Sequence, residues 1–74
     1  MTRYKDLSGG SGVVSYKTGP DHIAVEFKSG DMYLYTYKKP GKVAVEEMKK
    51  LAASGRGLST FISQQVHDRY EAKL

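Results

Sequence analysis

Residues 22–37, HIAVEFKSGDMYLYTY, decide the fold of this chain. On either side of Ser29-Gly30 the side chains alternate residue by residue between two sets that would face opposite ways, which is the pattern of two β-strands joined by a tight turn. A two-residue loop at Ser29-Gly30 sets one register between the strands. That register predicts an apolar face made of the pairs Phe27–Met32, Val25–Leu34 and Ile23–Thr36, and a second face made of Lys28–Asp31, Glu26–Tyr33, Ala24–Tyr35 and His22–Tyr37. A slip of one residue would exchange the two faces.

A third strand precedes this hairpin. Residues 13–17 (VVSYK) are rich in β-branched and aromatic side chains, which favour a strand. Residues 18–21 (TGPD) are typical of a turn, because proline presets φ and glycine tolerates positive φ. Closing that turn places Val14 and Tyr16 on the apolar face. The sequence therefore predicts a three-stranded antiparallel meander with the first strand of the hairpin in its middle.

After Pro40-Gly41 the hydrophobic period changes from that of a strand to that of a helix. A helix is predicted over residues 42–53, and Gly55 stands where a left-handed C-cap belongs. A second helix is predicted from about Leu58 to near His67, after which Tyr70 folds back as the last apolar anchor. The predicted buried faces of the two helices are Ala44, Val45, Met48, Leu51 and Ala52, and then Leu58, Phe61, Ile62 and Val66.

The two helices need an apolar surface to cover, and one face of the meander offers it. We therefore predict a two-layer α+β fold, in which a three-stranded antiparallel β-meander is followed by two α-helices packed on one face (βββαα). A chain of 74 residues makes one domain, which we expect to span residues 13–74. Residues 1–12 end in the flexible composition SGGSG and are expected to form a loosely docked, flexible arm.

Composition narrows the classes of function. The chain has no cysteine, so neither a disulfide framework nor a thiolate metal site is available. Residues 1–12 are polar, and no apolar run approaches the roughly 20 residues of a membrane span, so we expect a cytoplasmic protein without a membrane partner. The net charge is +4, and its surplus falls within residues 38–56. A local basic zone favours an anionic partner such as nucleic acid, although a modest charge also serves solubility alone.

Several short motifs occur along the chain in an order that matches the pattern of a known family. They are Val25-Glu26-Phe27-Lys28-Ser29-Gly30 leading into Tyr33-Leu34-Tyr35, then Ser54-Gly55-Arg56-Gly57-Leu58, Phe61-Ile62 and Arg69-Tyr70. Together they resemble the KTSC domain, a small domain also found at the C-terminus of some lysyl-tRNA synthetases, and the resemblance covers residues 12–70. The chain departs from the family pattern at Lys38-Lys39-Pro40-Gly41 and at Ser59. The resemblance implies no established activity, and RNA binding has been proposed for the family from its association with the synthetases.

The predicted register suggests a binding face. Tyr33, Tyr35 and Tyr37 would project from one side of a strand about 7 Å apart, in solvent if the helices cover the other side. Exposed aromatic rings beside lysines are platforms on which single-stranded bases stack. The candidate nucleic-acid-binding residues are therefore Tyr33, Tyr35, Tyr37, Lys28, Lys38, Lys39 and Arg56.

The same tyrosines also fit a chain that binds no nucleic acid. Tyrosine is a good strand former whose rings often just cover an outer sheet face, and the N-terminal arm could act as a roof for them. A protein interface would use the same rings, and Glu26 in the middle of the platform counts against phosphate binding there. Separately, Gly55-Arg56-Gly57 at the entry to the second helix suggests a phosphate cradle, although a tight interhelical turn accounts for the same residues.

No catalytic constellation is evident. His67 and Asp68 are sequence neighbours, which a helix points about 100° apart, and two histidines without an acidic cluster do not make a metal site. We expect no enzyme, no cofactor and no metal. The leading hypothesis is a non-enzymatic binding module for RNA or single-stranded nucleic acid, monomeric or weakly self-associating. The alternative is a protein-interaction module that uses the sheet face or the free edge of the first strand.

Overall fold

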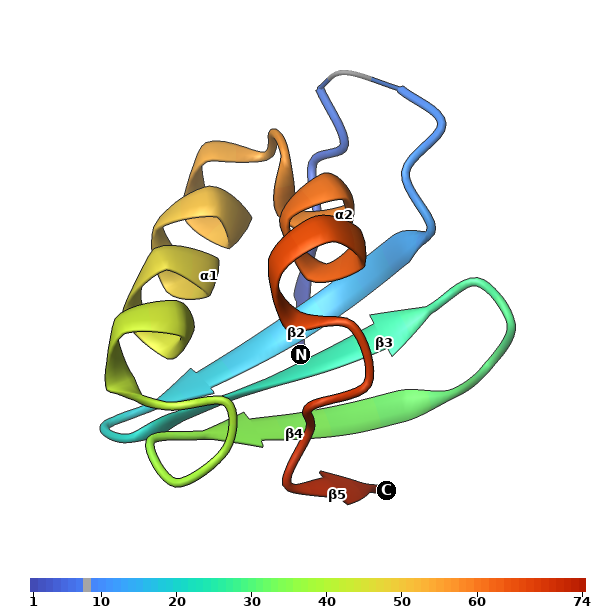
Figure 1. Cartoon of the computed structure of the whole chain (residues 1–74). Coiled ribbons are helices and arrows are strands. Elements are labelled where there is room, and N and C mark those ends of the chain that lie inside the picture. Colours follow the sequence, from blue (N-terminus) through green and yellow to red (C-terminus); the bar gives the residue numbers. More distant parts are fainter. Residues whose placement is uncertain (8) are drawn as a thin grey trace.

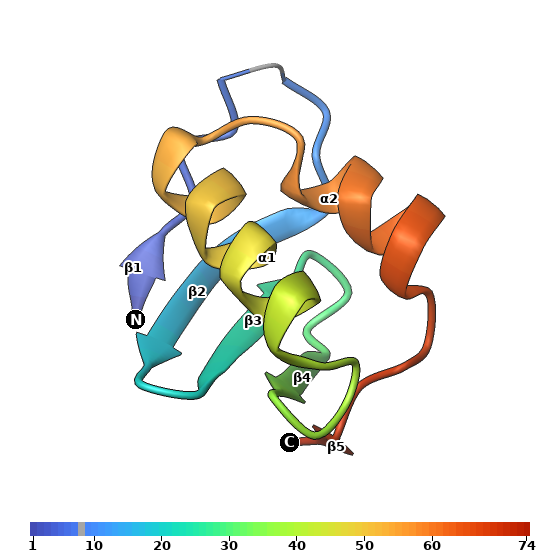
Figure 2. The ribbon, with the colours of Figure 1, turned by 60° about the vertical axis from the view of Figure 1, so that its left-hand side comes forward.

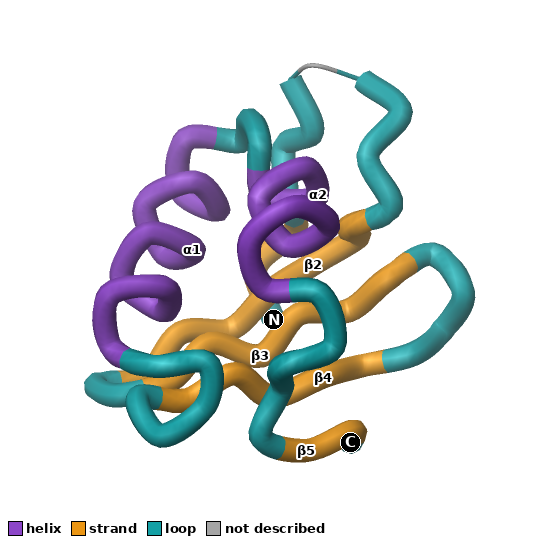
Figure 3. The backbone as a smooth tube through the Cα atoms, in the orientation of Figure 1, coloured by secondary structure: helices purple, strands orange, loops and turns teal. Residues whose placement is uncertain are grey.

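The computed structural model describes residues 1–7 and 9–74 as one sheet with helices on one of its faces (Figure 1, Figure 3). The elements are β1 (Thr2–Arg3), β2 (Val13–Gly19), β3 (His22–Phe27), β4 (Met32–Thr36), α1 (Lys42–Ser54), α2 (Leu58–Phe61), the π-helical turn η1 (Ile62–Val66) and β5 (Ala72–Lys73). The strands form one antiparallel sheet in the order β1-β2-β3-β4-β5. The α+β class and the helices on one face are confirmed, but the sheet has five strands instead of the predicted three. Figure 2 shows the two helices on the same side of the sheet after the molecule is turned.

The two additional strands flank the predicted meander. β1 pairs Thr2 with Tyr16 and Arg3 with Ser15, so the edge of β2 that was expected to be free is occupied at these two residues. Each of the two added strands is only two residues long, too short for an alternating pattern to reveal it. Thr2 and Arg3 are therefore part of the sheet, although they fall within residues 1–12, which we expected to form a loosely docked arm.

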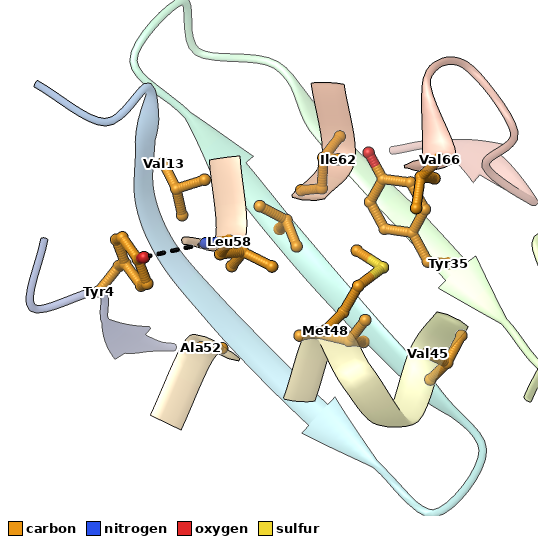
Figure 4. Close-up of a cluster of buried hydrophobic side chains, with 11 residues drawn as sticks. Tyr4, Val13, Tyr35, Val45, Met48, Ala52, Leu58, Ile62 and Val66 are labelled. Atoms are coloured by element: carbon orange, nitrogen blue, oxygen red, sulfur yellow. Dashed lines mark hydrogen bonds between the residues drawn. The ribbon is translucent and has the colours of Figure 1, made fainter. Parts of the chain in front are cut away.

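Tyr4 ties this first segment to the helical layer. Its side chain is only 3% exposed and belongs to the core cluster drawn in Figure 4. The backbone N–H of Leu58 donates a hydrogen bond to the Tyr4 hydroxyl oxygen at 3.3 Å, which satisfies a free amide at the start of α2. Both ends of the side chain are thus used, the ring for packing and the hydroxyl for capping.

The predicted register between β3 and β4 is wrong by one residue. Ile23 lies opposite Tyr35 and Val25 lies opposite Tyr33. The cause is the loop, which has three residues and not two: the Phe27 N–H donates to the Asp31 carbonyl oxygen at 2.9 Å, and Gly30 occupies the left-handed region at φ 94°. The shift exchanges the faces of β4, as it must for a side-chain period of two.

The consequence for the tyrosines is direct. Tyr33, Tyr35 and Tyr37 lie on the face that the helices cover, packed in or against the core, whereas Met32 and Leu34 point to the bare face. The prediction of an exposed, flat tyrosine platform is therefore wrong. Within the described residues, no helix lies on the other face of the sheet (Figure 1).

β2 carries a second irregularity. The register between β2 and β3 shifts between Val13 and Ser15, which is a β-bulge at Val14. Val13 is consequently buried at 2% exposure, while Val14, predicted to face the core, is 39% exposed. Tyr16 packs against the core, which confirms its predicted face, but it lies opposite Val25 and not opposite Ile23, where a turn over residues 18–21 would place it.

The helical layer follows the prediction closely. Val45, Met48 and Ala52 of α1 are buried, and Gly55 ends the helix in the left-handed conformation at φ 77°. Leu58, Ile62 and Val66 are buried in the second helical segment, which begins at the predicted residue and ends in a π-helical turn. In the described part of the chain, no helix combines the length and the apolar character that crossing a bilayer requires.

Candidate functional site: a tyrosine groove

Aromatic rings from distant parts of the chain meet above β4. The rings of Tyr33 and Tyr70 lie 4.4 Å apart at 39°, and those of Tyr35 and Tyr70 lie 6.5 Å apart at 88°. Phe27 stands edge-on to Tyr33 at 5.7 Å. These separations fall in the range that offset and edge-to-face aromatic pairs prefer, so the rings fix one another's orientation.

An open groove of about 350 Å³ runs along these rings, and we call it the tyrosine groove. Its floor and walls come from β4, from the turn between β3 and β4, and from the segment that follows η1. It is lined by Phe27, Ser29, Asp31, Tyr33, Tyr35, Ile62, His67, Asp68 and Tyr70. A concave, mostly aromatic surface with a few polar groups at its rim is the usual form of a small-ligand site.

The Tyr35 hydroxyl has a special position in the groove. The side chain is 1% exposed, and the hydroxyl makes no hydrogen bond to any described residue. In the described part of the chain, every side-chain N or O that is fully shut off from solvent has a partner. The Tyr35 hydroxyl must therefore reach the groove that its residue lines. Burial, together with the neighbouring Tyr33 and Tyr70, raises the pKa of Tyr35 to about 12, so the hydroxyl keeps its proton and remains a donor.

One side of the rim is a closed ionic network. The Lys73 Nζ lies 3.2 Å from the Asp31 carboxylate and 5.9 Å from the centre of the Tyr33 ring, and the Ser29 hydroxyl donates to the same carboxylate at 3.1 Å. The hydrogen bonds from Lys73 and Ser29 lower the pKa of Asp31. The hydrogen bond to Asp31 in turn raises the pKa of Lys73. On this side of the groove the negative charge of Asp31 is thus compensated by Lys73, and the carboxylate already has hydrogen-bond partners.

The other side of the rim is a strained turn. The Arg69 N–H donates to the Val66 carbonyl oxygen at 3.1 Å, which closes a four-residue turn with His67 as its first central residue. His67 has φ 56° and ψ −122°, the values of a type II′ turn at a position that glycine normally occupies. For a residue with a Cβ this conformation costs of order 1–3 kcal/mol. The side chains of His67 and Asp68 make no hydrogen bond or ion pair with the described residues, so both remain available to a ligand.

The remaining predicted site residues do not join this groove. Tyr37 packs against α1, where its hydroxyl donates to Glu46 at 2.7 Å and the Lys42 and Lys49 ammonium groups lie over its ring. That hydrogen bond raises the pKa of Tyr37 and lowers the pKa of Glu46. Lys38 and Lys39 are exposed in the connection that leads from β4 to α1.

Lys28 and Arg56 lie elsewhere again. Lys28 lines a separate hollow together with Arg3 and Lys5, and Arg56 is exposed in the turn between α1 and α2. The phosphate cradle expected at Gly55-Arg56-Gly57 has already lost one amide, because the Leu58 N–H is bonded to Tyr4. Of the seven predicted residues, the structure brings only Tyr33 and Tyr35 together in one site.

Sequence reasoning missed two parts of the site. Tyr70 was expected as an apolar anchor, which is confirmed by its packing on Tyr33, but not as the wall of a groove. His67 and Asp68 were set aside because they do not form a catalytic pair, whereas the turn places both on the wall of the groove beside the aromatic rings. The signal that would have found the groove is Gly30, because a three-residue loop with a left-handed glycine turns the tyrosines inward.

Comparison with protein-family models, with curated proteins and with solved structures finds no match to this chain. The chemistry of the tyrosine groove indicates what it can bind. Its rings offer π-faces and edges, Tyr35 offers a donor at the floor, and Asp68 offers an acceptor at the rim. These are the means of recognising a flat ligand that has a polar edge.

Proposed function

We propose that this protein is a non-enzymatic binding module that holds one unpaired base of RNA, or of another single-stranded nucleic acid, in the tyrosine groove. The observation that carries the proposal is the Tyr35 hydroxyl, which belongs to a buried side chain and has no partner among the described residues. The hydroxyl is not fully shut off from solvent, so it opens into the groove as a donor that no described residue uses. A ligand in the groove would accept its hydrogen bond.

A nucleobase fits the groove better than a charged ligand does. The titratable groups at the rim are Asp31 and Asp68 against Lys73, with His67 beside them, so the site holds no cationic cluster for a phosphate. A base is uncharged and flat, and one base stacked on an aromatic side chain is worth about 1–3 kcal/mol. Tyr33 and Tyr70 supply such rings.

The phosphates of the same strand would lie outside the groove. The chain has a net charge of +4, and Lys28, Lys38, Lys39 and Arg56 are exposed at several places on its surface. We assign these residues a role in long-range attraction and not in contact with the base. The resemblance of Tyr33-Leu34-Tyr35 to the KTSC motif agrees with this proposal.

The proposal is tested by removing a single atom. Tyr35→Phe keeps the ring and the core packing but deletes the hydroxyl. We expect wild-type protein to bind a labelled RNA of mixed sequence, about eight nucleotides long, more weakly as salt rises. Tyr35→Phe should weaken that binding about ten-fold, because the base loses a buried hydrogen bond, with no loss of thermal stability.

Tyr4→Phe is the matched control. It also deletes the hydroxyl of a buried tyrosine, but this hydroxyl has a protein partner, the Leu58 amide. Tyr4→Phe should lower the free energy of unfolding by about 1 kcal/mol and leave RNA affinity unchanged. Absence of RNA binding by the wild type at low salt would refute the proposal. Equal binding by wild type and Tyr35→Phe would show that the base is not bound in this groove.

A second candidate function is self-association through the bare face of the sheet. Met32 and Leu34 point to this face beside Glu26 and the buried Ala24, and no described helix covers it (Figure 1). The edge strands β1 and β5 are only two residues long, which discourages edge-to-edge pairing and leaves face-to-face stacking of two copies. Sedimentation at rising protein concentration tests this candidate. A salt-insensitive dimer that Leu34→Lys abolishes would support it, and a monomer at every concentration would rule it out.

A further inference from the structure

We propose that a basic hollow at the start of β2 holds a phosphate of the strand whose base lies in the tyrosine groove. The hollow has a volume of about 400 Å³ and is lined by Arg3, Tyr4, Lys5, Asp6, Val13, Val14 and Lys28. This inference rests on the function proposed above and adds to it a second contact site, which binds the backbone of the same strand.

The basic hollow gathers cationic side chains from two distant parts of the chain. Arg3 and Lys5 belong to the first segment, and Lys28 belongs to the turn between β3 and β4. The backbone brings these segments together, because β1 pairs with β2 and the Lys28 N–H donates to the Gly12 carbonyl oxygen at 2.8 Å, directly before β2. Three exposed cations therefore converge on one concave surface.

Most of the positive charge in the basic hollow is uncompensated. The side chains of Arg3, Lys5 and Lys28 make no ion pair or hydrogen bond with the described residues. The carboxylate that lines the hollow belongs to Asp6, and it accepts a hydrogen bond from the Ser11 N–H at 3.2 Å. Three positive charges against one negative charge favour an anion, and arginine and lysine are the side chains that bind phosphate in proteins.

The β-bulge in β2 shapes the floor of the basic hollow. It leaves Val13 at 2% exposure and turns Val14 outward at 39% exposure, and both side chains line the hollow. Bulges are frequent next to functional sites because they redirect a side chain. The apolar floor also has a low dielectric constant, which strengthens the attraction between the surrounding cations and an anion.

The basic hollow and the tyrosine groove meet at one turn. Phe27 and Ser29 line the groove, while Lys28 between them lines the hollow. Consecutive Cα atoms are about 3.8 Å apart, so the two sites lie on either side of the same short segment. Figure 1 shows this turn at the end of the sheet where β2 begins, whereas the connection from β4 to α1, which carries Lys38 and Lys39, lies at the opposite end.

The experiment measures how RNA affinity depends on salt. For a single strand, the slope of log K against log salt concentration is about −0.7 for each phosphate that the protein neutralises. Lys28→Gln removes the charge of an exposed side chain that has no partner among the described residues, so the fold should keep its stability. The variant should bind a labelled RNA of about eight nucleotides roughly five-fold more weakly at low salt, with a slope shallower by about 0.7.

Lys38→Gln is the matched control, because it makes the same change of charge at an exposed lysine that does not line the basic hollow. It should change the slope by less than about 0.2. Tyr35→Phe should weaken binding at every salt concentration and leave the slope unchanged, because it removes no charge.

The three variants separate the two proposals. Equal slopes in Lys28→Gln and Lys38→Gln would overturn the inference, and weaker binding by Tyr35→Phe would then still support the proposed function. A shallower slope in Lys28→Gln alone, with unchanged binding by Tyr35→Phe, would support the phosphate site and refute the base site. Absence of RNA binding by the wild type at low salt would refute the function and the inference together.

Discussion

Tyr33 and Tyr70 pack ring on ring, 4.4 Å apart at 39°, and this contact joins β4 to the segment that follows η1. The backbone strengthens the same junction, because the Glu71 N–H donates to Leu34 O and the Leu74 N–H donates to Met32 O, both at 2.7 Å. The last residues of the chain thus serve as an edge strand and as a wall of the tyrosine groove. Any change that releases this segment also opens the groove.

Tyr70→Ala tests this coupling. It removes a half-buried ring that touches both Tyr33 and Tyr35, so we expect a loss of about 1–3 kcal/mol in binding of single-stranded RNA. The free energy of unfolding should fall by about 1–2 kcal/mol, because part of an aromatic side chain leaves the core. Fluorescence titration and urea denaturation measure the two effects separately.

Tyr37→Ala controls for the loss of a half-buried tyrosine from the same sheet face. Tyr37 contacts Glu46, Lys42 and Lys49 of α1 and does not line the groove. Its removal should destabilise the fold to a similar extent and leave RNA affinity within about two-fold of the wild type. An equal loss of affinity in the two variants would show that RNA contacts the row of tyrosines along β4 and not the groove alone.

The helical layer was predictable because helical periodicity is a local property. Val45, Met48 and Ala52 recur at helical spacing, and Gly55 marks the end of α1 by its tolerance of positive φ. None of these signals depends on which residues lie across the sheet. The α+β class and the helices on one face followed from them.

Which face of the sheet the tyrosines occupy was not predictable by the same means, because the two alternating sets of side chains in β4 are almost equally hydrophobic. Met32, Leu34 and Thr36 make one set and the tyrosines make the other, and either set is hydrophobic enough to be buried. A single loop residue decides between them, and the loop is closed by a hydrogen bond between Phe27 and Asp31. The groove itself needs Tyr70 and Asp68, which come from a segment without periodicity.

His67→Gly is expected to stabilise the protein. Glycine adopts φ 56° and ψ −122° without the Cβ clash, so the free energy of unfolding should rise by about 1 kcal/mol. The gain is smaller than the strain because glycine also makes the unfolded chain more flexible. The same variant should bind RNA less well, since an imidazole is missing from the rim. Thermal denaturation and RNA titration of one sample give both numbers, and a destabilised variant would show that the turn is not strained.

Gly55→Ala is expected to destabilise the junction between α1 and the first segment. At φ 77° an alanine Cβ would lie 2.8 Å from the Lys5 Cβ and 3.2 Å from the Leu7 Cγ, so the backbone and both side chains have to move. We expect a loss of more than about 1 kcal/mol in the free energy of unfolding, measured by urea denaturation. Gly12→Ala is the control: its φ is not positive, and its nearest neighbour is a Phe27 atom at 4.0 Å. A loss as large in Gly12→Ala would mean that the effect is not specific to the junction.

Alkaline pH should destabilise the fold through Tyr35. Burial raises its pKa from 10.0 to about 12 in the folded protein, so above pH 10 the folded state holds a proton that the unfolded state has lost. The free energy of unfolding then falls as pH rises towards 12, with a slope from this group of at most about 1.4 kcal/mol per pH unit.

Tyr35→Phe isolates that contribution, because the raised pKa of Lys73 and the raised pKa of Tyr37 act in the same direction and remain in the variant. Urea denaturation at several pH values between neutral and strongly alkaline should show a shallower decline for Tyr35→Phe than for wild type. The two curves should separate only above the pKa of an unfolded tyrosine, because below it both states hold the phenolic proton. Parallel curves through the alkaline range would show that the Tyr35 hydroxyl is solvated like an ordinary phenol, and the groove would then lack the buried donor on which base recognition depends.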